Sequence, residues 1–269
     1  MPFKIFLLCL CILPARYSVA QELAPVPNPL SSSPDVALSS WVTPAIWSGE
    51  KLEYEIGWGL ITVGKADMTV LKTVLTGNST SYYIISTAKS TSFIDSFYKV
   101  RDVNESWIDS VSMASAGYSK NIREGGFFRD EWVNFNTALM TFISQTVNKE
   151  GKASVLQGPL TGPVQDMLSA LYYIRTQPLE VGKDIIFDVN TKKNWPMVVK
   201  VHKREKIKTP AGKFDCFKIE PKMRDEGIFV PKGKSMIVWV TADQRHIPVL
   251  MQAEVLIGHV SARLVSHTP

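Results

Sequence analysis

Residues 51–58 (KLEYEIGW) alternate strictly between apolar and polar side chains, and this alternation limits what the chain can fold into. One face of the segment carries an apolar set, Leu52, Tyr54, Ile56 and Trp58. A repeat of two residues is that of a half-buried β-strand and does not fit a helix. The pattern therefore predicts a strand with one face on an apolar core.

More segments rich in strand-forming residues follow, and turn-forming residues such as Gly125-Gly126 and Thr209–Gly212 separate them. After Gly64 the apolar positions of the second segment move by one residue, which predicts a β-bulge at that glycine. Beyond this segment, strands are predicted at 82–88, 100–108, 116–123, 127–135, 139–145, 184–189, 197–207, 213–220, 235–241 and 247–257. We expect the last of these to bend or bulge at Gly258 and to continue to Val265.

One amphipathic helix is predicted at about residues 163–177, between Gly162-Pro163 and Pro178. Its apolar stripe consists of Val164, Met167, Leu168, Leu171 and Ile174. Asp166 near its start and Arg175 near its end suit the helix dipole. We interpret each of these two charges as a cap of the helix or an anchor to the sheet.

Many short strands around one helix favour a single antiparallel domain over βαβ units. The predicted fold is mainly β: a curved antiparallel sheet that forms a half-open barrel or a sandwich, over residues 47–269. Proline and serine are frequent in residues 21–46, which we predict to be a flexible tether.

Residues 1–20 have the three parts of a secretory signal peptide. Lys4 provides the positive charge, residues 5–13 the apolar run, and Ser18-Val19-Ala20 the small residues before a cleavage site after Ala20. A run of this length is too short to span a bilayer as a helix. We therefore predict a periplasmic protein without a stable membrane span in the mature chain; the alternative is an N-terminal membrane anchor.

Charge gives no reason to expect nucleic-acid binding. Loss of Lys4 and Arg16 with the signal lowers the net charge from +5 to +3, and the remaining basic residues are spread along the chain. The basic run at 200–208 (KVHKREKIK) keeps a partial two-residue period through its valines and isoleucine. This favours the solvated face of a strand.

No pattern of residues predicts catalysis, a metal or a cofactor. Cys216, the one cysteine of the mature chain, is flanked by apolar residues, which favours a buried and inert thiol. The histidines do not occur at metal-ligand spacing, and no G-x-S-x-G motif is present. Asp243, Arg245 and His246 cluster in a predicted turn, and we favour a polar hairpin tip over a binding site there.

Five segments together resemble the bacterial domain-of-unknown-function 3108 family, and they span about residues 47–265. They are 49–54 (GEKLEY), 64–66 (GKA), 165–175 (QDMLSALYYIR), 209–214 (TPAGKF) and 239–249 (WVTADQRHIPV). The resemblance implies an exported bacterial protein and transfers no site residue. In outline the predicted fold is also similar to periplasmic lipoprotein carriers, half-open barrels that hold acyl chains under a helical lid.

Three functions are compatible with these features. The first is binding of a hydrophobic small molecule or lipid between the curved sheet and the helix, with walls formed by Tyr54, Trp58, Leu168, Leu171 and Tyr172. The second is a non-enzymatic interaction with an envelope protein, through edge strands or the turn at residues 243–246. A hydrolase acting on envelope polymers is a third reading, for which the sequence offers no motif.

Overall fold

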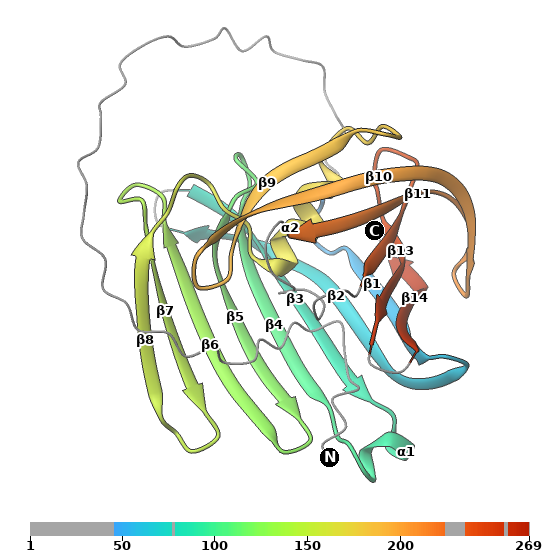
Figure 1. Cartoon of the computed structure of the whole chain (residues 1–269), viewed down its shortest axis with the longest axis horizontal. Coiled ribbons are helices and arrows are strands. Elements are labelled where there is room, and N and C mark those ends of the chain that lie inside the picture. The colour runs from blue at the N-terminus through green and yellow to red at the C-terminus, as the bar shows by residue number, and fades with distance from the viewer. Residues whose placement is uncertain (1–45, 77–78, 224–234, 256–257, 269) are drawn as a thin grey trace, which may run out of the picture.

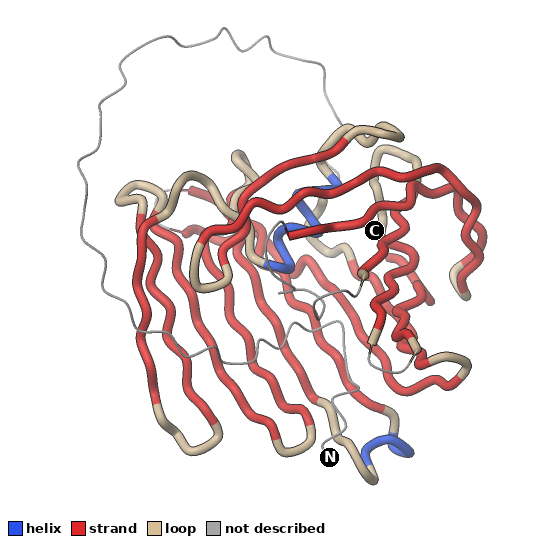
Figure 2. The backbone as a smooth tube through the Cα atoms, in the orientation of Figure 1, coloured by secondary structure: helices blue, strands red, loops and turns tan. Residues whose placement is uncertain are grey.

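Fourteen antiparallel strands form one continuous sheet in a computed structural model that describes residues 46–76, 79–223, 235–255 and 258–268 (Figures 1 and 2). The strand order is β8-β7-β6-β5-β4-β3-β2-β1-β14-β13-β12-β11-β10-β9. The predicted signal peptide and almost all of the predicted tether lie outside the described residues. The predicted mainly β, curved and open fold is confirmed.

The first half of the sheet is an up-and-down meander of eight strands. Its strands are β1 (Lys51–Trp58), β2 (Ile61–Thr76), β3 (Ser79–Ser90), β4 (Arg101–Asp109), β5 (Ser115–Glu124), β6 (Phe127–Asn136), β7 (Thr141–Asn148) and β8 (Ala153–Pro159). In β2 the residue Val63 has no partner, because Ile56 lies opposite Gly64 and Gly57 lies opposite Thr62. The β-bulge predicted at Gly64 is therefore confirmed.

The second half is a meander of six strands. Its strands are β9 (Asp184–Asn190), β10 (Asn194–Thr209), β11 (Gly212–Met223), β12 (Met236–Thr241), β13 (Pro248–Glu254) and β14 (His259–Thr268). The two halves join where β1 pairs with β14, with Lys51 opposite Thr268. The outer strands β8 and β9 do not pair with each other, so the sheet stays open.

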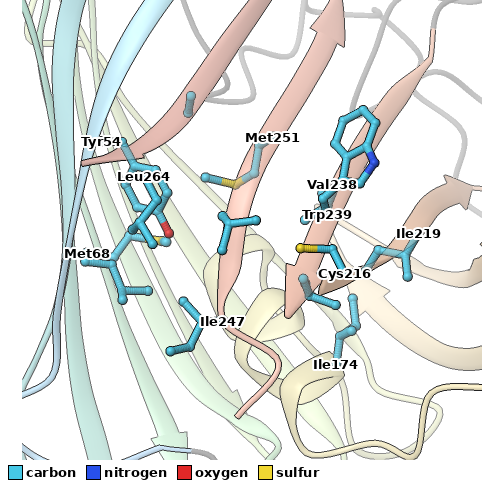
Figure 3. Packing of buried hydrophobic residues seen from close by; sticks show 14 of the residues in the cluster. Tyr54, Met68, Ile174, Cys216, Ile219, Val238, Trp239, Ile247, Met251 and Leu264 are labelled. Atoms are coloured by element: carbon cyan, nitrogen blue, oxygen red, sulfur yellow. The ribbon is translucent and has the colours of Figure 1, made fainter. Parts of the chain in front are cut away.

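Helix α2 (Met167–Arg175) links β8 to β9 and lies against the inner face of the curved sheet (Figure 1). A short helix, α1 (Ser92–Asp95), connects β3 to β4 at the strand ends that lie away from α2 (Figure 1). The main apolar core fills the space between α2, β1, β2 and the second meander. In Figure 3, Tyr54 and Met68 lie on one side of this core and Val238, Cys216 and Ile219 on the other.

The helix begins later than predicted. Pro163 lies in a turn, and Gln165 forms an isolated parallel bridge with Val189, so the first regular helical residue is Met167. The backbone N–H of Gln165 donates to Asp188, and that of Asn190 donates to Gln165. These bonds hold the segment in an extended conformation up to the cap at Asp166.

The end of the sheet also differs from the prediction. The stretch expected as one strand from Ile247 to Val265 is a hairpin, because the chain reverses at Gly258 and β14 returns beside β13. Gly258 has a φ of +77°, a left-handed conformation that favours glycine. Two elements have no counterpart among the predictions: β8, whose side chains are mostly exposed on both faces, and the single turn of α1.

Cys216 is fully buried in the main core, as predicted. Burial, followed by the charges of Asp215, Asp243 and Glu205, raises the pKa of its thiol to about 12. Only the thiolate reacts with alkylating and disulfide reagents. At pH 8 the folded protein therefore holds this thiol protonated as well as inaccessible.

We predict that the folded mature chain does not react with Ellman's reagent at pH 8 over many minutes. In guanidinium chloride the unfolded chain should release one equivalent of thionitrobenzoate per molecule within seconds. The measurement is the absorbance of released thionitrobenzoate over time, without denaturant and in guanidinium chloride. Fast labelling of the folded chain would contradict a buried thiol.

Candidate functional site

A cavity of about 150 Å³ lies between α2 and the inner face of the sheet. Most of its walls are apolar, and they come from both meanders and from the helix. The first meander contributes Tyr54, Ile56, Ala66, Met68 and Ala88, the second Met197, Ile219, Met236, Val238, Met251 and Ala262, and the helix Met167, Leu168, Ala170, Leu171 and Ile174. Alternation along the strands explains this lining, because every second side chain points inward.

Methionine is concentrated in these walls. Five of the nine methionines in the chain line the cavity: Met68, Met167, Met197, Met236 and Met251. Methionine side chains are unbranched and flexible, and they adapt to guests of differing shape. The cavity therefore has adaptable apolar walls.

One end of the cavity is polar. Ser86, Asn104 and Lys120 line it there from β3, β4 and β5, and all three side chains are half-buried. Asp166 also borders the cavity and is almost completely buried. The arrangement is thus an apolar space with a polar group of side chains at one end.

The start of α2 is fixed by Asp166. Its carboxylate accepts hydrogen bonds from the backbone N–H groups of Leu168 (2.8 Å) and Ser169 (3.1 Å), which caps the helix. Its other oxygen accepts from the hydroxyls of Ser106 (2.6 Å) and Ser115 (2.7 Å) on β4 and β5. One buried carboxylate thus caps the helix and ties it to the first meander.

The end of α2 is fixed by Arg175. Its guanidinium donates two hydrogen bonds of 2.7 Å to Glu50, one to each carboxylate oxygen, and its Nε donates to the carbonyl of Arg245 (3.1 Å). The side chains are 1% and 0% exposed, so this ion pair is buried in the molecule. Burial alone would lower the pKa of Arg175, but the hydrogen bonds and charge of Glu50 raise it.

The turn between β12 and β13 packs on the same helix end. His246 Nδ1 donates to the carbonyl of Arg175 over 3.0 Å, and burial lowers the pKa of this histidine. Asp243 and Arg245 form an exposed ion pair in this turn. The polar hairpin tip predicted at residues 243–246 is confirmed. It also packs against the C-terminal end of α2.

The structure places three of the five predicted wall residues, Tyr54, Leu168 and Leu171, on the cavity. Tyr172 instead lies in a second buried cluster with Ile46, Val70, Ile84 and Ile108. Trp58 lies next to the turn at Gly258, at the edge of the main core. The interpretation of Asp166 and Arg175 as cap and anchor is confirmed.

The opposite face of the sheet carries a shallow hollow of about 510 Å³. The residues that line it include Trp107, Gly117, Trp132 and Ile143. Trp132 and Ile143 are 46% and 44% exposed. This surface and the exposed edge strand β8 are apolar regions that none of the described residues covers.

Two kinds of site are absent from the described residues. Neither helix is long and apolar enough to cross a bilayer. Within the same described part of the chain, no three metal-binding side chains of histidine, cysteine, aspartate or glutamate lie together.

Comparison with known proteins identifies a family. Residues 53–265 match the family model described as protein of unknown function (DUF3108). No curated protein sequence matches the chain.

Solved structures give a likeness of fold. A β-barrel-like protein of the domain of unknown function DUF1849 from Brucella abortus is similar at 8% identity with a TM-score of 0.52, over 82% of this chain and 97% of that one. Two weaker matches are a candidate exported protein with a YmcC-like fold from Bacteroides fragilis and a candidate lipoprotein from Parabacteroides distasonis. The first has 9% identity and a TM-score of 0.38, over 83% of this chain and 97% of that one. The second has 10% identity and a TM-score of 0.32, over 82% of this chain and 96% of that one.

We predict that Arg175→Met lowers the free energy of unfolding by about 3–5 kcal/mol, because it leaves the Glu50 carboxylate buried without its guanidinium. The double variant Glu50→Leu with Arg175→Met should be more stable than Arg175→Met, since no charge stays buried alone. Urea unfolding followed by tryptophan fluorescence measures both.

Arg204→Met is the matched control for this experiment. Arg204 pairs with Asp215 on β11, but both side chains are about half exposed. Its loss should leave the unfolding midpoint unchanged within error. Equal destabilisation by the two arginine variants would contradict a special role for the buried pair.

Proposed function

The chain belongs to the DUF3108 family of proteins of unknown function, and from the geometry of its cavity we propose that it binds an apolar molecule, a lipid or acyl chain. The observation that supports this most strongly is the set of five methionines in the cavity walls. Flexible methionine walls are common at sites that accept varied apolar guests.

The volume of the cavity limits what enters it. Its 150 Å³ equals the engineered apolar cavity that holds a benzene molecule. A short stretch of acyl chain fits this space, and the remainder of a larger ligand would lie outside it. The cavity would therefore enclose part of the ligand and leave the rest outside.

The proposed place of action is the periplasm, on the basis of the signal peptide read in residues 1–20. Native mass spectrometry of protein purified from its own cells tests location and binding together. We expect the intact mass of a chain that begins at Gln21. Under gentle conditions we also expect a complex that is heavier than this chain by the mass of one lipid. Only ligand-free protein, together with no uptake of added decanol or decanoate, would contradict the binding proposal.

We predict that Leu171→Trp weakens binding of decanol and of decanoate at least tenfold, because the larger ring occupies the cavity. Leu171 is half-buried, so its replacement has room to fit without unfolding the helix. Tyr173→Trp is the control: it lies on the same helix, is also half-buried and contacts Phe187 outside the cavity. Calorimetric titration gives the affinities, and circular dichroism verifies that both variants fold.

A second candidate function is binding of an envelope protein along β8. This edge strand exposes Val155 and Leu156 at 62% and 42%, and an unpaired edge can accept a further strand. A photo-crosslinker placed in cells at either position should give one adduct of the same mass. Crosslinkers at the fully exposed Leu60, on the β1–β2 turn, should not give it; the same adduct there would contradict a specific edge contact.

A further inference from the structure

We infer that the ligand is an amphiphile with an anionic head group, a carboxylate or a phosphate ester, which Lys120 recognises at the polar end of the cavity. The inference rests on the proposed function and adds the chemistry of the head. It is carried by the order of side chains across neighbouring strands.

A single row of paired residues crosses the inner face of the sheet. Lys120 lies opposite Asn104, Asn104 opposite Ser86, Ser86 opposite Met68, and Met68 opposite Leu52. Paired residues of antiparallel strands point to the same face, so the row presents an ammonium, an amide, a hydroxyl, a thioether and an isobutyl group in order. The side chains also pass from half-buried Lys120 to fully buried Leu52.

This order matches an amphiphile laid along the row. Four of the five residues, all except Leu52, line the cavity itself. An acyl chain would lie at Met68 and beyond, where the walls are apolar. Its head would lie beside three polar side chains, all capable of donating hydrogen bonds.

The charge of Lys120 is not neutralised by a carboxylate in the described structure. Its Nζ lies 4.7 Å from the centre of the Tyr118 ring, a cation–π contact, and it has no ion pair with a described residue. Glu131, its partner on β6, instead accepts from the Tyr118 hydroxyl (3.0 Å) and pairs with Arg129 (3.0 Å).

The acidic groups near the row are also engaged elsewhere. Asp166 and Glu105 both line the cavity. Asp166 accepts four hydrogen bonds at the start of α2, and the carboxylate of Glu105 accepts a hydrogen bond from the hydroxyl of Tyr83. Asp102 lies two residues before Asn104 on the same face, is buried, and accepts a hydrogen bond from the backbone N–H of Arg123 (2.8 Å). An anion at the polar end would therefore meet one cation whose charge is still available.

The head-group chemistry follows from these charges. An ammonium group binds carboxylates and phosphates as a point charge, and charge-assisted hydrogen bonds are stronger than neutral ones. A wholly apolar ligand would desolvate Lys120 without compensation, which is unfavourable. A cationic head would be repelled at the same place.

Four amphiphiles with the same tail and different heads test this inference on the mature chain. Below their micellar concentrations, decanoate and decyl phosphate should bind about tenfold more tightly than decanol, and decyltrimethylammonium more weakly than decanol. Inorganic phosphate serves as the head without a tail and should not bind measurably. Calorimetric titration gives each affinity.

We predict that Lys120→Met removes the preference, with an approximately tenfold loss for decanoate and less than twofold for decanol. Lys120→Arg should keep it. Lys65→Met is the control. Lys65 lies on β2 just before the cavity residue Ala66, and its exposed side chain points to the opposite face of the sheet.

The outcomes separate the two proposals. If decanol and decanoate bind equally and Lys120→Met changes neither affinity, the anionic head is wrong and the proposed apolar binding stands. If no decyl compound binds, the proposed function itself fails. Binding of inorganic phosphate as tight as that of decyl phosphate would show a free-anion site and overturn the amphiphile.

Discussion

The buried charges at the two ends of α2 support the rest of the structure. A helix of nine residues is too short to be stable in water by itself. Asp166 ties its start to β4 and β5, and Arg175 ties its end to Glu50 just before β1 and to the turn after β12. Because the helix is held in this way, one curved layer of strands can bury its inner face, and the space that remains beneath the helix becomes the cavity.

The strands could be predicted from the sequence wherever one face is buried and the other solvated. The alternation at residues 51–58 gives β1 with its exact bounds. The prediction failed where this contrast is missing: β8 is exposed on both faces, and nothing in its sequence marks it as a strand. It failed at Gly258 and at Pro163 because a glycine or proline signals a break in the pattern without fixing whether the chain bends, reverses or extends.

The site could be predicted only in part, because periodicity shows which residues share a face and not what lies opposite. Leu168 and Leu171 belong to the apolar stripe of the helix and Tyr54 to the apolar face of the first strand, and all three lie on the cavity. Tyr172 lies outside that stripe and packs in a separate cluster. Glu50 and Arg175 are 125 residues apart, and the row from Lys120 to Leu52 depends on the register of four strand pairs. Neither can be read from local sequence.

The central position of the β1–β14 pair has a consequence for when the protein can act. Neighbouring strands within each meander follow one another directly in the sequence, whereas Lys51 meets Thr268 only after nearly the whole described chain has been made. Such distant pairing costs more loop entropy and slows folding. Met68 and Met251 come from different halves of the sheet. The cavity therefore does not exist until β1 has paired with β14. A partly made chain therefore has no cavity for the proposed ligand, and we expect that ligand to bind only after the last strand has paired.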